Sequence, residues 1–195
     1  MARLGGWLFT RRTALPLPVA VAILLIPGGN SPSAAVVIVG VLIVAAGEAL
    51  RLWGVHHIGA ISRTRSDRLG PLVTTGPFAR VRNPLYIGNM LIWAGFAVAA
   101  RIVWMAPVVA VLLGFEYHAI VRWEERLLET RRADDYRAYV RRVPRWVPRF
   151  GAIGRHVAAE TGVSPYFWRD TMFSERGTIV AIAVGFALLA WKSRW

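Results

Sequence analysis

The sequence predicts an all-α, polytopic membrane protein with about five transmembrane helices. Of its 195 residues, 55% are hydrophobic, and they are gathered in long runs instead of recurring at the period of an amphipathic helix or strand. The formal net charge of +13 is carried by basic residues that lie mostly between these runs. We therefore expect residues 1–195 to form a single integral membrane domain.

The composition also excludes several classes of site and partner. The absence of cysteine excludes disulfides, thiolate metal sites and a cysteine nucleophile. No two of the four histidines have metal-ligand spacing on one helix face, so no metal is expected. The basic residues flank apolar segments, where anionic lipid headgroups account for them, and we expect no nucleic-acid partner.

Five apolar segments are expected to span the bilayer, in the order 15–26, 34–55, 85–100, 102–120 and 177–191. The first resembles a signal peptide, but further spans follow it, so we expect it to be retained. It is short, and it either crosses the bilayer or lies partly at the interface. Only the region of Arg101 separates the third span from the fourth, which predicts a tight antiparallel hairpin.

Arginine is distributed unevenly between the spans. The polar segments 56–83 and 121–176 carry five and twelve arginines, whereas Arg101, Lys192 and Arg194 lie on the opposite side. By the positive-inside rule both segments and the N-terminus face the cytoplasm, in an inner (cytoplasmic) membrane.

The stretch GPFARVRNPLYIGN contains the first candidate site. Asn83 is a favourable N-cap and Pro84 suits the first turn of the third span. One interpretation is a capped helix with interfacial arginines and an interfacial Tyr86. The other is an anion site, because a helix N-terminus beside Arg82 offers free N–H groups and positive charge.

Residues 118–149 contain the second candidate site and are expected to continue helically out of the fourth span. His118, Arg122, Glu125 and Glu129 share one stripe, which is either a solvated face with Arg122–glutamate ion pairs or part of a site. Glu124 adjoins Glu125 on another part of the helix surface and should have a different role. The sequence VPRWVPR then ends the helix and returns the chain as an extended segment.

Taken together, LVTTGPFARVRNPLYIG, EERLL and YRAYVRRVPRWVP resemble the isoprenylcysteine carboxyl methyltransferase and phospholipid methyltransferase superfamily. The resemblance covers residues 48–148. It implies a membrane methyltransferase that moves a methyl group from S-adenosylmethionine to a lipid-like or prenylated acceptor. The chain has Phe78 where tyrosine is usual and Asn83 where histidine is usual, so any proton transfer must use another group.

The resemblance further implies a cofactor pocket at the cytoplasmic membrane surface. Its matching positions are Leu72, Val73, Phe78, Arg82, Asn83, Pro84, Leu85, Tyr86 and Glu125. Arg82 and the helix start suit the cofactor's carboxylate, Glu125 suits its ribose hydroxyls or amino group, and apolar residues suit adenine. Arg122 is a candidate substrate contact. No catalytic residue is assigned, because in-line displacement depends chiefly on positioning.

Two alternatives remain open, namely an NADPH-dependent membrane reductase of the sterol-reductase type and a non-catalytic membrane scaffold. The binding of S-adenosylmethionine, of NADPH or of neither separates the three hypotheses. The C-terminal part, 150–195, is expected to form an interfacial segment or lid and the last span. On that span Gly177, Ala181 and Gly185 form a small-residue stripe, which is expected to pack against another span or a second copy of the chain.

Overall fold

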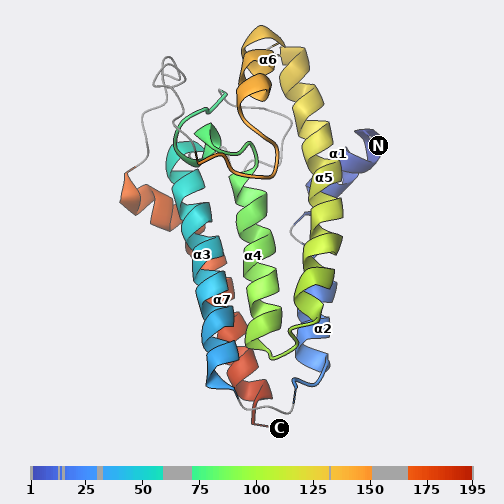
Figure 1. Cartoon of the computed structure of the whole chain (residues 1–195), viewed down its shortest axis with the longest axis vertical. Coiled ribbons are helices and arrows are strands. Elements are labelled where there is room, and N and C mark those ends of the chain that lie inside the picture. Colours follow the sequence, from blue (N-terminus) through green and yellow to red (C-terminus); the bar gives the residue numbers. More distant parts are fainter. Residues whose placement is uncertain are drawn as a thin grey trace.

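The computed structural model describes residues 2–12, 14, 16–29, 33–58, 72–131, 133–150 and 167–194. The helices in this part of the chain are α1 (Ala2–Arg11), α2 (Leu17–Leu25), α3 (Ala34–Ile58), the 3-10 helix η2 (Gly76–Ala79), α4 (Pro84–Ala99), α5 (Met105–Arg131), α6 (Ala133–Arg142) and α7 (Trp168–Lys192). The long helices run along one axis, with η2 and α6 at one end and α2 and the C-terminus at the other (Figure 1). The predicted all-α class is confirmed.

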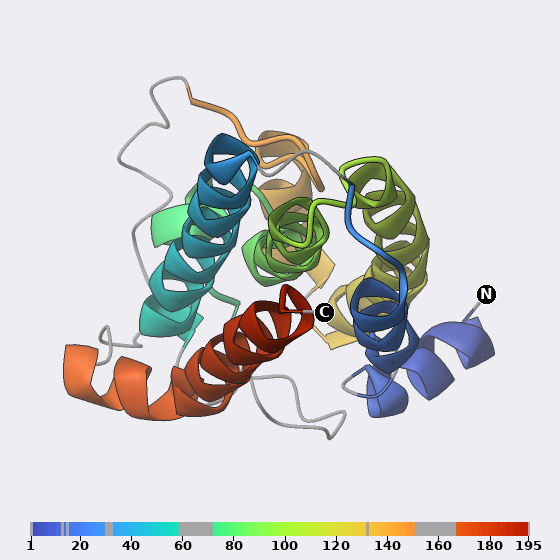
Figure 2. The ribbon, with the colours of Figure 1, turned by 90° about the horizontal axis from the view of Figure 1, so that it is seen from below.

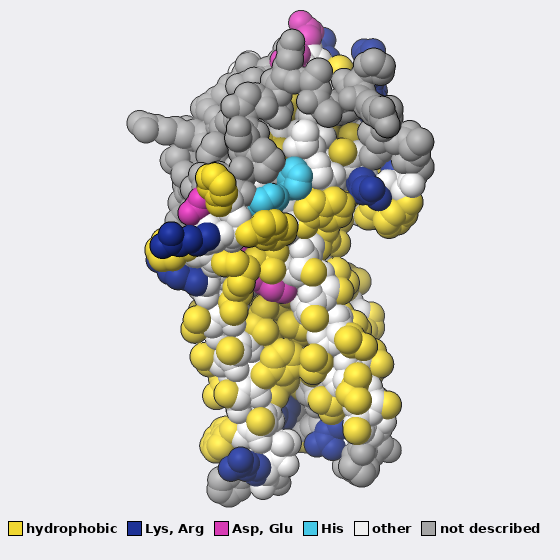
Figure 3. All heavy atoms as spheres, turned by 90° about the vertical axis from the view of Figure 1, so that its left-hand side faces the viewer, with side chains coloured by type: hydrophobic (Ala, Val, Ile, Leu, Met, Phe, Trp, Pro, Cys, Tyr) yellow, Lys and Arg dark blue, Asp and Glu magenta, His cyan; other side chains and the backbone are white. Residues whose placement is uncertain are grey.

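Among the described residues, three helices are long and apolar enough to cross a membrane. They are α3, α7 and the part of α5 from Met105 to Thr130, and α4 is a shorter apolar helix. Seen from below, α4 lies between α3 and α5, while α7 and the N-terminal helices cover one face of this row (Figure 2). The side formed by α3 and α7 is largely apolar along its length, as expected for a surface in contact with lipid (Figure 3).

The expected first span, 15–26, differs from the structure. α2 has nine residues, about 13 Å of helix, which is far less than the thickness of a bilayer. Pro16 and Pro18 lack the N–H groups that a helix continuing from α1 would need. The N-terminal part is therefore two short helices, of which α1 packs on α5, with the Phe9 and Trp123 rings 4.9 Å apart.

The other helices begin and end close to the predicted bounds, except that α7 begins earlier than expected. α3 begins at residue 34 as expected, and α4 begins and ends one residue before its predicted bounds. As predicted, the fourth span continues helically into the polar residues that follow it, and α5 extends without a break to Arg131. α7 begins at Trp168 instead of Gly177, so the polar residues before the apolar run are helical too. Of the candidate interfacial segment or lid at 150–176, residues 151–166 lie outside the described residues, and the part from Trp168 onward belongs to α7.

The predicted hairpin between the third and fourth spans is confirmed at Arg101. Its φ angle is +63°, in the left-handed region that closes helix C-termini. The N–H of Arg101 donates to Val98 O at 2.8 Å, and the N–H of Ile102 donates to Ala97 O at 2.9 Å. These bonds satisfy the last carbonyls of α4 and reverse the chain into α5.

Close backbone contact fixes α4 against α3. A Cβ added to Gly47 would lie 2.7 Å from Gly88 O, and one added to Gly95 would lie 2.8 Å from Val44 N. Only glycine permits such an approach, which is how helices gain contact in lipid, where no hydrophobic force drives them together. The position of the first turn of α4 is thus set by α3.

A buried polar cluster joins three helices below that first turn. Arg51 of α3 donates to Asn89 Oδ1 of α4 at 2.5 Å and to Glu175 Oε2 of α7 at 2.6 Å. It also reaches Thr178 Oγ1 at 3.3 Å, and its Nε lies 3.5 Å from Glu48 Oε2. Only 1% of the Glu175 side chain is exposed, so the arginine compensates a carboxylate that has almost no access to solvent or lipid.

The small-residue stripe of α7 is only partly as predicted. Gly185 faces α4, where an added Cβ would lie 2.7 Å from Phe96 Cζ. Gly177 and Ala181 are exposed on the described surface, so these two residues do not pack against another span within the chain. The inward side of α7 near its start is formed instead by Thr171 and Glu175.

Replacing Arg51 by methionine is expected to lower the free energy of unfolding by about 3–5 kcal/mol, because Glu175 loses the arginine that compensates its buried charge. Adding Glu175→Met should recover most of this loss. Melting temperatures in detergent measure both effects. A double variant as unstable as the single variant would contradict the assignment of this pair.

Gly185→Leu is expected to lower the melting temperature in detergent, because a bulky side chain must displace the Phe96 ring, at a cost of about 1–3 kcal/mol. Gly177→Leu, on the exposed side of the same helix, is the matched control and should leave stability nearly unchanged. Equal effects of the two substitutions would show that the packing of α7 does not depend on Gly185.

Candidate functional site

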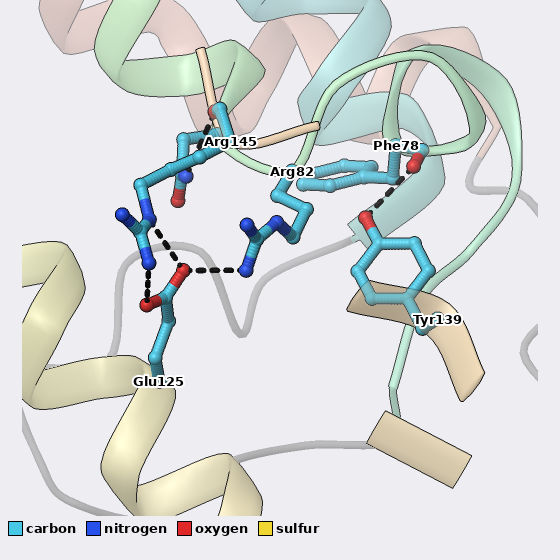
Figure 4. Close-up of polar contacts among 6 residues, drawn as sticks. Phe78, Arg82, Glu125, Tyr139 and Arg145 are labelled. Atoms are coloured by element: carbon cyan, nitrogen blue, oxygen red, sulfur yellow. Dashed lines mark hydrogen bonds and ion pairs between the residues drawn. The ribbon is translucent and has the colours of Figure 1, made fainter. Parts of the chain in front are cut away.

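The candidate site lies at the end of the bundle where α4 begins and α5 continues past it. Four parts of the chain meet there: the segment containing η2, the first turn of α4, α5 near Glu125, and the segment 143–149 that follows α6 (Figures 1 and 4). They are distant in sequence, and the polar contacts described below join them.

Glu125 forms the centre of the site. Arg82 Nη1 donates to its Oε1 at 2.7 Å, Arg145 Nε donates to the same oxygen at 2.9 Å, and Arg145 Nη2 donates to Oε2 at 2.7 Å (Figure 4). Only 8% of Glu125 is exposed, so these charge-assisted bonds replace its hydration. Of the two interpretations of this stripe, the one that pairs Arg122 with Glu125 does not agree with the structure: Arg122 is exposed, and Glu125 pairs with arginines from two other segments.

The return of the chain after α6 is as predicted, and backbone hydrogen bonds fix it. The N–H of Arg82 donates to Pro144 O at 2.9 Å, and the N–H of Arg149 donates to Arg80 O at 3.0 Å. Pro144 has no N–H to continue α6, so the segment is free to pair with residues 80–82. This pairing brings Arg145 next to Arg82.

Asn83 occupies the predicted N-cap position of α4 but does not cap the helix with its side chain. Its Nδ2 donates to Arg145 O at 3.1 Å instead. Pro84 is the first helical residue, as expected. The first turn of α4 therefore receives no side-chain acceptor from Asn83, and the partial positive charge of its start is not offset there.

Glu124 and Glu125 have separate partners, as predicted. The Tyr86 hydroxyl donates to Glu124 Oε1 at 3.0 Å. The Tyr86 ring lies 4.8 Å from that of Tyr117, which is 2% exposed. Glu124 thus belongs to a second polar pair, which joins α5 to α4.

The apolar positions expected at the site are gathered around α6. Val73 and Phe78 are buried, and Leu72 packs against a cluster formed by Tyr136, Tyr139 and Val143. Leu85 differs, because its side chain is directed towards α3, within van der Waals distance of Gly54. Leu85 therefore supports the helix packing more directly than it lines the site.

Tyr139 of α6 holds the segment that contains Phe78. The Tyr139 hydroxyl donates to Phe78 O at 2.7 Å (Figure 4). Burial raises the pKa of Tyr136 to about 12 and also raises the pKa of Tyr139, so both hydroxyls remain neutral at physiological pH. The hydrogen bonds that Arg145 donates to Glu125 raise the pKa of the Arg145 guanidinium, so this group stays charged.

Sequence reasoning assigned no role to Arg145, Tyr139 or Arg51. An arginine between the two prolines of PRWVP was one available signal, because a stiffened segment can hold a side chain in a fixed place. The spacing of Tyr136 and Tyr139 was another, since residues three apart share a helix face. Arg51 is an ionisable residue inside a predicted span, which alone indicates a buried partner.

The apolar helices of the bundle are those of an integral membrane protein, and one end of the bundle holds a buried carboxylate between two arginines. The family model described as phospholipid methyltransferase matches residues 35–131, about half of the chain. The chain belongs to this family, and with it to the superfamily that includes the isoprenylcysteine carboxyl methyltransferases. The match contains Arg82, Tyr86 and Glu125 but not Arg145.

Two curated relatives share part of the chain. One is the nickel-cobalt-cadmium resistance protein NccN of Alcaligenes xylosoxydans xylosoxydans, 33% identical over 117 residues, which are 60% of this chain and 52% of the relative. The other is the cobalt-zinc-cadmium resistance protein CzcN of Cupriavidus metallidurans, 30% identical over 110 residues, which are 56% of this chain and 48% of the relative. The chain thus spans about half the length of the curated relatives it matches. No solved structure matches the chain.

Arg82→Ala is expected to lower the free energy of unfolding by about 1.5–3 kcal/mol, because Glu125 loses one charge-assisted hydrogen bond while it stays buried. Arg80→Ala is the matched control, two residues away and exposed, and should change stability by less than about 0.5 kcal/mol. Thermal unfolding in detergent compares them. Equal, small losses would indicate that both arginines act only as interfacial charges.

Proposed function

We propose that this protein transfers a methyl group from S-adenosylmethionine to a lipid-like or prenylated acceptor that reaches the site from the bilayer. The observation that supports this most directly is the Arg82–Glu125–Arg145 cluster beside the start of α4, two of whose members lie in the family-matched region. When bound, S-adenosylmethionine supplies an electrophilic methyl group on a sulfonium.

The residues present suit the parts of this cofactor. Arg82 and the start of α4 offer donors and positive charge to a carboxylate. Glu125 offers acceptors to an ammonium group or to ribose hydroxyls. Leu72, Val73 and Phe78 provide an apolar environment beside them, which suits adenine.

The contribution of the protein to such a reaction is chiefly positional. Buried ion pairs and the Tyr139 bond to Phe78 O hold the site in place, so little reorganisation is needed when reactants meet. A carboxylate acceptor is already ionised and needs no base. For an acceptor that must lose a proton, Glu124 is the nearest carboxylate not paired with arginine in the cluster, and Asn83 cannot serve because it does not titrate. Arg122 stays a proposed substrate contact on the exposed side of α5.

We also propose that the protein lies in the inner membrane with the site facing the cytoplasm. Most described arginines lie at the site end of the bundle, and the opposite end has Arg101, Lys192 and Arg194, which fits the positive-inside rule. The two curated relatives are named for resistance to metal ions. If this chain also takes part in resistance to metal ions, its proposed contribution is methyl transfer, for which its arginine, carboxylate and tyrosine residues would position the reactants.

S-adenosylhomocysteine is expected to bind the purified protein in detergent, and Glu125→Gln should weaken this binding by about 10- to 150-fold, which corresponds to the loss of one charged hydrogen bond. Glu129→Gln, one turn further along α5 and exposed, is the matched control and should bind normally. Isothermal titration calorimetry measures both affinities.

The same titration separates the alternatives. Binding of NADPH instead of S-adenosylhomocysteine would favour the reductase hypothesis, and binding of neither would favour a scaffold. Unchanged affinity in the Glu125 variant would remove this carboxylate from the site.

A further inference from the structure

Arg145 differs from Arg82 in how much of its side chain is exposed. Both donate to Glu125, but the Arg145 side chain is 26% exposed, whereas that of Arg82 is 12% exposed. Arg82 is followed directly by the first residues of α4, which pack on α3. Arg145 lies in an extended segment outside any helix. Of the two cations on Glu125, Arg145 is therefore the one whose side chain has room to move.

The backbone around Arg145 is fixed independently of its side chain. The carbonyl of Arg145 accepts from Asn83 Nδ2 at 3.1 Å, and the carbonyl of Pro144 accepts from the N–H of Arg82 at 2.9 Å. A change of rotamer at Arg145 would break its two bonds to Glu125 and leave these backbone contacts intact. The guanidinium can thus change partner without moving the segment that carries it.

The charges of the cluster suit a ligand that carries both signs. Arg82 and Arg145 supply two positive charges, and Glu125 supplies one negative charge. Next to them, the start of α4 has no side-chain cap. Buried charges are tolerated only while each has a partner. A zwitterionic amino-acid group preserves that condition, because its ammonium can take the place of Arg145 on Glu125 while its carboxylate binds the released guanidinium.

We propose that Arg145 is an exchangeable cofactor ligand, which holds Glu125 in the free protein and turns to the carboxylate of the cofactor's amino-acid group when the cofactor binds. The proposal rests on the proposed function and adds a residue outside the family-matched region. It explains why Asn83 is turned away from its capping position, since its amide fixes the backbone from which Arg145 must reach both partners. In this arrangement Arg82 remains on Glu125 throughout.

The test compares two ligands that differ only in the carboxylate: S-adenosylhomocysteine and its decarboxylated analogue, S-adenosyl-3-thiopropylamine. Arg145→Ala is expected to weaken S-adenosylhomocysteine by about 10- to 100-fold and to leave the decarboxylated analogue unweakened, because the analogue has no group for the arginine to bind. Arg145→Lys should show a smaller selective loss, since it keeps the charge without the bidentate fork. Arg149→Ala is the matched control on the same segment and should bind both ligands as the wild type does.

Calorimetry of both ligands is combined with melting temperatures, so that affinities are compared on folded protein. If Arg145→Ala does not fold, Arg145→Gln replaces it, because glutamine can still donate to Glu125. Equal weakening of both ligands would show that Arg145 only positions Glu125, and unchanged affinity for both would show that it takes no part; either result overturns the proposal. A wild-type protein that binds neither ligand overturns the proposed function and this inference together, whereas a non-selective loss overturns this inference alone.

Discussion

The arrangement at the site end depends on keeping one buried carboxylate paired. Glu125 is nearly inaccessible, and an unpaired charge there would be far more costly than any packing gain. Its two arginines come from two segments that pair with each other, one just before α4 and one after α6. Satisfying Glu125 therefore requires that α5 extend beyond the apolar region, that α4 begin at Pro84, and that the chain return after α6. The local order of this region follows from that single requirement.

The second constraint lies within the bundle, where lipid offers no hydrophobic force to assemble helices. α3 and α4 meet through glycines whose backbones nearly touch, which is close packing without polar groups. α7 has a smaller packed area and is attached to α3 through the Arg51–Glu175 pair. Because Arg51 also binds Asn89, one side chain sets the depth of α7 relative to α4 about one turn below Tyr86. The glycine contacts and the Arg51 cluster thus fix the position of α4, whose first turn is part of the candidate site.

The sequence predicts the helical class because long apolar runs have few other stable states in a bilayer. It also predicts the approximate bounds of α3 and α4 and the hairpin at Arg101. The first apolar segment forms a helix, α2, with both prolines at its start as predicted, and its nine residues favour the interfacial alternative over a full span. Arg82, Tyr86 and Glu125 were predicted through motifs, but the partners of Glu125 were not. Local spacing suggested Arg122, whereas the actual partner Arg145 lies twenty residues away, and only the return of the chain after α6 brings it near. A side chain with two available partners, such as Asn83, cannot be assigned from local propensity alone.

The division between the family-matched region and the rest of the chain has a physical meaning. The matched residues, 35–131, contain the packed pair α3–α4, all of α5 and one arginine of the cluster. On their own they would leave Glu125 with Arg82 as its only arginine partner and Arg51 without Glu175. Arg145 and α7, which complete these two ion pairs, come from the C-terminal part. Such segments can vary while the helical core is kept, as long as each supplies a group of the required charge. The buried charges of the family-matched helices are therefore completed by contacts from outside the matched region, whereas the packing of α3 on α4 lies wholly within it.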